Sequence, residues 1–181
     1  MTILFQAMNV ADERKGLKYF IESLEIVQQR YPDLIKKVKL TFFGKSDNLD
    51  LSDIDIEYED LGFLTEEKQI VQACQNASVF VIPSLEDNLP NAVIESLACA
   101  TPVLGFDTGG IPEMVDHKQN GFIAQQRNSS ELAQGLNWIL EDSDRYEELC
   151  KNARKKVMSQ YTYNKTSQSY HELYSTLLNK G

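Results

Sequence analysis

The sequence predicts an α/β protein in which a parallel β-sheet is doubly wound, that is, covered by helices on both faces. Short apolar stretches of strand length alternate with longer stretches whose apolar residues have helical spacing. Several of the expected strands are apolar at consecutive positions, as is typical of a parallel sheet with both faces buried. Because strands and helices alternate along the whole chain, parallel pairing is favoured over hairpins.

Six strands are expected, and each is an apolar run that ends at a glycine, a proline or polar residues. They cover residues 3–8, 38–43, 54–58, 79–82, 103–106 and 121–124. No internal repeat or linker interrupts this order, so residues 1–181 are expected to form a single domain.

Four of the expected helices lie between these strands or directly after the last one. The helix after Gly16 has an apolar face at Leu17, Phe20, Ile21, Leu24 and Val27. Thr65 is expected to cap a helix that runs to Asn76, and Pro90 suits the first turn of the next helix. Asn128 and Glu131 have the spacing of a capping box for a helix over residues 129–141.

The C-terminal segment is expected to be helical over residues 145–161, to break at Thr162 and to be helical again from Tyr163. Its last helix carries a stripe of aromatic and apolar residues at Tyr170, Leu173, Tyr174, Leu177 and Leu178.

The junction after the strand at 79–82 is the most informative feature, because a buried strand runs through a polar loop into a helix. The first amides of that helix, those of Asn91 and Ala92, point outward and favour an anion. Carboxylates flank this point at Glu86, Asp87 and Glu95. Since acids would repel a phosphate, they are expected to accept hydrogen bonds from hydroxyls of the same ligand. A sugar nucleotide has both a phosphate and such hydroxyls.

Composition excludes several other classes. The net charge of −9 argues against a nucleic-acid surface, which needs a basic stripe. No apolar run is long enough to cross a membrane, and the first residues lack the features of a signal peptide, so a cytoplasmic protein is expected. Cys74, Cys99 and Cys150 are expected within helices as buried thiols rather than as a disulfide framework or a zinc site.

The segment from Asp87 to Val103 resembles a known enzyme family. An acidic residue and a glutamate with seven residues between them, here Asp87 and Glu95, are followed by a small-residue helix and Thr101-Pro102-Val103. This pattern resembles the C-terminal, nucleotide-binding domain of a retaining glycosyltransferase with the two-domain GT-B fold, of the family 4 type. Asp87 takes the place of the usual glutamate, and the sub-pattern 86–91 is similar to that of bacterial surface-polysaccharide enzymes.

The resemblance implies a Rossmann-like domain that binds a UDP- or GDP-sugar and forms the C-terminal half of a GT-B enzyme. Because the chain begins in a core strand, a second Rossmann-like domain is expected to precede it and supply the acceptor site. The helices over residues 145–179 would pack back on that domain, whereas the plainer interpretation of the aromatic stripe is packing on this domain itself. Membrane association is expected to be peripheral and to depend on the full-length enzyme.

The resemblance also implies roles for residues on both sides of the cleft. Lys15 matches a lysine that contacts the donor diphosphate in the family. The family also has an arginine earlier in the chain, but this sequence has Asn9 at that position, so Arg14 is the nearby arginine able to replace it. Asp87 would hold sugar hydroxyls and Glu95 the ribose. The wider substrate-binding set is Glu86, Asn88, Leu89, Pro90, Asn91, Ala92, Gly62 and Phe63, with the last two walling the base.

No metal or other cofactor is expected, because no Asp-x-Asp motif lies beside the phosphate site; Asp53 and Asp55 have that spacing at a strand start. Plainer interpretations exist for these residues: a solvated charge run at 12–15, an exposed helix glutamate at Glu95, and a turn at Gly62. The glycines at 109 and 110 in the loop 108–113 are expected only to permit a turn. A sugar-nucleotide epimerase and a catalytically silent binding domain stay open as alternatives.

Overall fold

The structure, a computed structural model, describes residues 1–9, 12–45 and 51–178, with the side chains of residues 7–9 and 45 outside that description. A six-stranded sheet lies at its centre in the order β3-β2-β1-β4-β5-β6, and every neighbouring pair is parallel. The predicted α/β doubly wound, Rossmann-like sheet is therefore confirmed. The strand order reverses between β1 and β4, which is where parallel sheets of this kind bind ligands.

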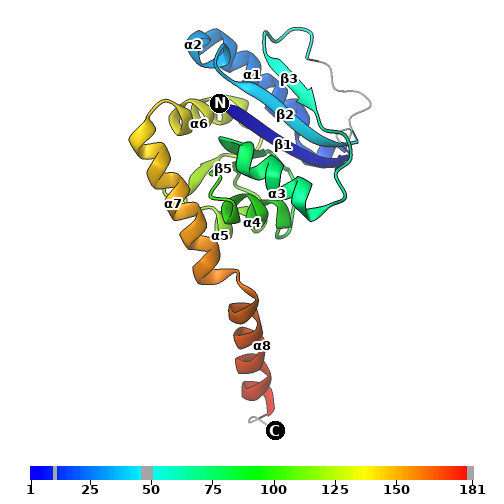
Figure 1. Cartoon of the computed structure of the whole chain (residues 1–181), viewed down its shortest axis with the longest axis vertical. Helices are drawn as coiled ribbons and strands as arrows, with labels where there is room; N and C mark the ends of the chain where they lie inside the picture. The colour runs from blue at the N-terminus through cyan, green and yellow to red at the C-terminus, as the bar shows by residue number, and fades with distance from the viewer. Residues whose placement is uncertain (10–11, 46–50, 179–181) are drawn as a thin grey trace.

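The strands are β1 (Thr2–Asn9), β2 (Lys39–Lys45), β3 (Glu57–Asp60), β4 (Val79–Ile82), β5 (Val103–Phe106) and β6 (Gly121–Ala124). The helices are η1 (Glu13–Lys15), α1 (Leu17–Arg30), α2 (Pro32–Ile35), α3 (Glu67–Asn76), α4 (Asn91–Ala98), α5 (Ile111–Met114), α6 (Ser129–Leu140), α7 (Ser143–Gln160) and α8 (Tyr163–Leu178). Figure 1 shows α7 running along the domain and α8 projecting from it.

Both faces of the sheet are buried, because alternate side chains of one strand enter different clusters. Ile3 and Phe5 pack with α1, α2 and α6, whereas Leu4 packs with α3, α4 and α7. The same alternation separates Val81 from Phe80 in β4. This two-sided burial explains why these strands are apolar at consecutive positions.

The third strand was predicted at 54–58 and is instead β3, Glu57–Asp60. Ile54 and Ile56 are buried, but they lie in the segment that leads into the strand. The strand itself is at the sheet edge and its four side chains are exposed. An edge strand can pair through its backbone without apolar side chains, so apolarity located it incorrectly.

The predicted Thr65 cap is also wrong, because α3 begins at Glu67 with Glu66 as its N-cap. The Glu66 amide donates to the side-chain oxygen of Gln69, at 3.4 Å, which is the reciprocal bond of a capping box. At α6 the expected Asn128 cap is confirmed, since its side chain accepts from the Glu131 amide at 3.0 Å.

The prediction of three buried cysteines within helices is partly wrong. Cys74 is buried in α3, and burial raises the pKa of its thiol to about 12. Cys99 and Cys150 are half-buried, and Cys99 lies at the C-cap of α4 rather than inside it. Among the described residues, no helix is both long enough and apolar enough to span a membrane.

Candidate functional site

The segment over residues 12–16 leads into α1 and carries the basic residues predicted for the site. Asp12 accepts from the Arg14 amide at 3.0 Å and begins the short helix η1. Gly16 then adopts a left-handed backbone with φ of 69°. A Cβ at this position would lie 1.8 Å from the carbonyl oxygen of Pro83, at the end of β4. Glycine is therefore required here to bring the β1 and β4 ends together.

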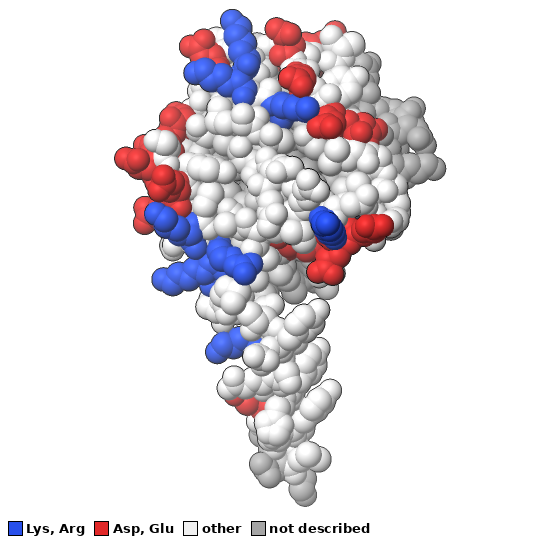
Figure 2. Space-filling view, in the orientation of Figure 1, with Lys and Arg blue, Asp and Glu red and all other residues white. Residues whose placement is uncertain are grey.

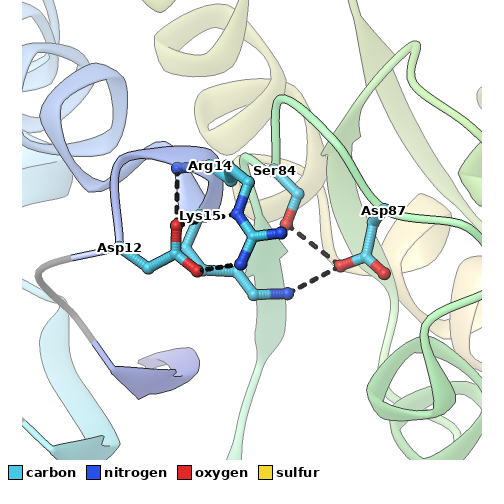
Figure 3. Close-up of polar contacts among 5 residues, drawn as sticks. All are labelled: Asp12, Arg14, Lys15, Ser84 and Asp87. Carbon is cyan, nitrogen blue, oxygen red and sulfur yellow. Dashed lines mark hydrogen bonds and ion pairs between the residues drawn. The ribbon is translucent and has the colours of Figure 1, made fainter.

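The side chains of Arg14 and Lys15 have different partners (Figure 3). The Arg14 guanidinium makes bonds of 3.1 and 2.8 Å to the two carboxylate oxygens of Asp12. The side-chain hydrogen bonds from Arg14 are the main cause that holds the pKa of Asp12 below its usual value, and the bond from the Arg14 backbone amide adds to it. The Lys15 ammonium instead crosses to Asp87 Oδ2, at 2.9 Å. Lys15 therefore links the β1 loop to the predicted acidic motif through its side chain.

The loop after β4 is held against the β1 loop and the start of α4. Its Leu85 amide donates to the Arg14 carbonyl oxygen at 2.7 Å, and the Ser84 hydroxyl reaches Asp87 Oδ2 at 3.4 Å. Helix α4 follows at Asn91, with Pro90 at the N-cap rather than in the first turn as predicted. The Val93 amide donates to the Pro90 carbonyl at 3.0 Å, whereas Asn91 and Ala92 occupy the first turn, where amides lack intrahelical acceptors.

The loop after β5 closes over the acidic loop through its two glycines. The Gly110 amide donates to the Asn88 carbonyl oxygen at 2.6 Å. A Cβ on Gly109, whose φ is 52°, would lie 1.7 Å from the carbonyl oxygen of Asp87. The sequence suggested that these glycines only permit a turn. In the structure they also allow the backbone to approach the loop that carries Asp87.

These loops surround an open cavity of about 740 Å³ at the carboxyl end of the sheet. The predicted residues Arg14, Lys15, Glu86, Asp87 and Asn88 line it. The sequence analysis missed Asp107 and Gln126, which also line it, from the loops after β5 and β6. Only the alignment of strand ends in the folded sheet could have indicated them.

Leu89, Pro90, Asn91 and Ala92 do not line this cavity, although they follow directly from it toward α4. The turn at Gly62 and Phe63 lies after the edge strand β3. Gly62 has φ of 66°, and its amide donates to Asp60 Oδ1 at 2.7 Å. The ring of Phe63 is exposed at 63%, which leaves an aromatic face available to a ligand. Asn9 ends β1, and its side chain lies outside the described part of the chain.

Glu95 is exposed on α4, as the plainer interpretation of an exposed helix glutamate expects. Its predicted contact with a ribose stays a prediction. Partial desolvation by surrounding protein atoms raises the pKa of Glu95, and the like charge of Glu67 on α3 adds to this effect. No ion pair or side-chain hydrogen bond to its carboxylate occurs within the described residues.

The described residues contain no group of three or more His, Cys, Asp or Glu side chains arranged to hold a metal ion. Positive charge at the cavity comes instead from Arg14 and Lys15. The site thus combines a helix start, a cationic side chain and carboxylates at the strand-order reversal of a parallel sheet. This combination is typical of nucleotide-binding α/β domains.

Comparison with known proteins narrows that class. The family described as Glycosyl transferases group 1 matches residues 2–156, and the chain belongs to this family. Its fold is that of the C-terminal domain of GT-B enzymes, as shown by the C-terminal domain of the group 1 glycosyl transferase LpcC from Francisella tularensis. That structure superposes with a TM-score of 0.73 at 19% identity, covering 90% of this chain and 86% of the other.

The curated relatives that the chain matches are longer than the chain itself. It is 28% identical over 167 residues to the N,N'-diacetylbacillosaminyl-diphospho-undecaprenol alpha-1,3-N-acetylgalactosaminyltransferase of Campylobacter jejuni, covering 91% of this chain and 42% of that one. The Anabaena protein HepE, solved in complex with UDP-glucose, has a TM-score of 0.76 at 20% identity and is covered to 48%, against 96% of this chain. The chain spans less than half the length of the curated relatives it matches.

Proposed function

We propose that the chain is the donor-binding half of a nucleotide-sugar-dependent glycosyltransferase of the family 4 type, with retention of anomeric configuration. The observation that carries the proposal is the Lys15–Asp87 pair, 2.9 Å long, which spans the strand-order reversal just before α4. Membership of the glycosyl transferases group 1 family supports transfer over the alternatives of epimerisation or silent binding.

In the proposed complex the donor diphosphate lies between Lys15 and the first amides of α4. Its charge competes with Asp87 for the Lys15 ammonium, which frees the Asp87 carboxylate to accept from hydroxyls of the sugar. Arg14 lines the same cavity, and its contribution requires the guanidinium to exchange Asp12 for the ligand.

The nucleoside is proposed to extend toward Glu95 and the turn at Gly62. Glu95 is free of a protein cation in the described structure, so its carboxylate is available to the ribose hydroxyls. The exposed ring of Phe63 supplies a wall for the base. Whether the base is uracil or guanine is decided by the binding experiment below.

The proposed reaction breaks the bond between the anomeric carbon and the diphosphate oxygen, so negative charge develops on the departing diphosphate. Lys15 and the α4 amides stabilise that charge from fixed positions, which lowers the barrier without a metal ion. Asp87 and Glu86 hold the sugar and orient its anomeric carbon toward the acceptor.

The acceptor site is proposed to come from a second, Rossmann-like domain, against which α8 packs. The Campylobacter relative is named as a transferase acting on a lipid-linked diphosphate sugar, which favours a role in polysaccharide or glycolipid biosynthesis in a bacterium. We place the enzyme in the cytoplasm, with peripheral membrane contact through the full-length protein.

Calorimetric titration of the chain with UDP and GDP tests the donor site, with EDTA in one series and magnesium in the other. Binding of one nucleotide is expected in both series. Lys15→Ala should weaken it by about 1.5–3 kcal/mol, the size of a charge-assisted hydrogen bond. Lys18→Ala is the matched control, because Lys18 is exposed on α1 and its nearest acidic partner, Glu22, is 3.9 Å away. Strict magnesium dependence, or equal binding by both variants, would overturn the proposed site.

Sugar transfer is expected from the full-length enzyme and not from the 181-residue chain alone, because the proposed second domain would supply the acceptor site. The measurement is release of the nucleoside diphosphate with and without acceptor. Robust transfer by the isolated chain would contradict the two-domain assignment. Conversion of the donor to an epimer by the full-length enzyme without acceptor would identify the epimerase alternative.

A further inference from the structure

Gln126, in the loop between β6 and α6, joins two other loops of the cavity through its side-chain amide. Its Nε2 donates to the Leu85 carbonyl oxygen at 2.7 Å and to the Thr108 hydroxyl at 2.9 Å. Leu85 lies in the loop after β4 and Thr108 in the loop after β5. The orientation of the amide is determined, because a carbonyl oxygen only accepts and must face the NH₂ group.

The backbone of Leu85 is consequently held at both its amide and its carbonyl group. Its amide donates to the Arg14 carbonyl oxygen at 2.7 Å, and its carbonyl accepts from Gln126. Leu85 directly precedes Glu86 and Asp87, so the peptide sets where these two carboxylates start. At the far side of Asp87, the Gly110 amide holds the Asn88 carbonyl at 2.6 Å.

Gln126 differs from the other links in this chain of contacts. The bonds from Leu85 to Arg14 and from Gly110 to Asn88 use backbone atoms alone. The bond to the Leu85 carbonyl requires a side-chain donor of the length of glutamine. The next residue, Arg127, has a left-handed backbone with φ of 64°, an unfavourable state for a residue other than glycine. Such a conformation persists where surrounding contacts determine it, and the two bonds of the Gln126 side chain are contacts of this kind.

We propose that Gln126 is a positioning residue of the donor site, which fixes the Leu85 peptide and so places Asp87 against Lys15. The ligand part of this inference rests on the proposed function, whereas the effect on the loop does not. A residue with this role should control the diphosphate and sugar end of the site. It should leave the nucleoside end, near Glu95 and Phe63, unchanged, because those residues do not line the cavity.

Gln126→Glu is the most selective variant, because the carboxylate has the same shape but cannot donate to the Leu85 carbonyl. Gln125→Glu is the matched control: it makes the same charge change at the neighbouring exposed position, where the hydrogen bond to Glu131 comes from the backbone amide. Thr108→Val removes one acceptor and leaves the bond to Leu85. Gln126→Met, which is neutral and close in size, separates loss of the donor from added negative charge.

Hydrogen exchange is measured first, on the full chain without ligand. Gln126→Glu and Gln126→Met should speed amide exchange across residues 84–88 about tenfold, because losing one hydrogen bond makes local opening easier. Exchange elsewhere and the melting temperature should stay close to those of Gln125→Glu. Thr108→Val should have a smaller effect. Unchanged exchange at 84–88 in both Gln126 variants would overturn the inference.

Ligand binding is measured second, with UDP and uridine, or with GDP and guanosine if GDP is the tighter ligand of the wild-type chain. Both Gln126 variants should bind the nucleoside diphosphate about five- to tenfold more weakly, the effect of one lost hydrogen bond. They should bind the nucleoside within about twofold of wild type, since its contacts are distant. Equal weakening of both ligands together with a lower melting temperature would show a general structural role and overturn the inference. If the wild-type chain binds neither nucleotide, the proposed function fails, and the exchange measurement still decides the role of Gln126.

Discussion

The carboxyl end of the sheet and helix α8 are both exposed, but they are held in different ways. At the sheet end, loops after β1, β4, β5 and β6 are joined by backbone and side-chain bonds, and glycines allow their close approach. Helix α8 has no buried residue, and its principal neighbour is α7. Figure 2 shows that its surface in this view is mostly uncharged. Exposure at the sheet end thus belongs to a formed cavity, whereas exposure along α8 belongs to a face without a partner in the described chain.

Helix α7 is fastened to the domain up to the point where α8 begins. Lys156 pairs with Asp116 at 2.9 Å, and the Tyr161 hydroxyl donates to the Glu113 carbonyl at 3.1 Å. Arg154 also donates to the carbonyl oxygen of Ala98 at the end of α4. The apolar stripe of α8 is therefore carried on an anchored support, as expected if α8 packs on a second domain.

The strongest test of the contrast is Gly16→Ala. A Cβ would meet the Pro83 carbonyl at 1.8 Å, in addition to the cost of a left-handed backbone. Together these should lower the free energy of unfolding by about 3 kcal/mol or more. Gly62→Ala is the control, because Gly62 has φ of 66° but nothing within 4 Å of the added Cβ. It should cost only about 1–2 kcal/mol in urea denaturation. Equal losses would show that the loops are not tightly joined.

Sequence analysis assigns Glu95 to the donor site, but its carboxylate has no partner within the described residues, as is also true of the apolar face of α8. Glu95→Ala tests whether the carboxylate binds a ligand. Losing an acceptor for ribose should cost about 1.5–3 kcal/mol of affinity for both nucleoside and nucleoside diphosphate. Stability should hardly change, because alanine favours helix and no protein cation is left unpaired. A variant that melts much lower yet binds normally would make Glu95 structural.

Acid pH offers an independent test of Glu95. Its pKa is raised by desolvation and by the charge of Glu67. As the pH is lowered, nucleoside affinity should therefore begin to fall at a higher pH than it would with a glutamate of ordinary pKa. Glu95→Gln should remove this component of the pH dependence. Because the folded-state pKa lies above the unfolded value, ionised Glu95 disfavours the folded state. Glu95→Gln should therefore be slightly more stable than wild type above the folded pKa, and the difference should vanish as the pH falls below the unfolded pKa.

The smallest effect is expected on α8. Leu173→Ser changes a residue that is 51% exposed, so the melting temperature of the chain should shift by the equivalent of about 0.5 kcal/mol or less. Leu136→Ala on α6, where the side chain is fully buried, should cost about 2–5 kcal/mol in the same assay. A large loss from Leu173→Ser would mean that α8 packs on this domain in solution.

The sequence by itself determined the bounds of strands β4, β5 and β6, which match the predicted runs. It could do so because these strands are covered on both faces, and two-sided burial requires apolar residues at nearly every position. Pro90 after the polar loop likewise indicated where α4 begins, within one residue of the observed start.

Only the tertiary structure decided the bounds of the edge strand β3, the environment of Glu95 and the full lining of the cavity. β3 pairs through its backbone, so its side chains gave no signal of its bounds. Asp107 and Gln126 are distant from Asp87 in the sequence and reach its cavity because parallel strands end at the same edge of the sheet. A hydrogen bond such as that from Gln126 to Leu85 depends on how closely loops from different strands approach each other, and local residue patterns do not predict the distance between those loops.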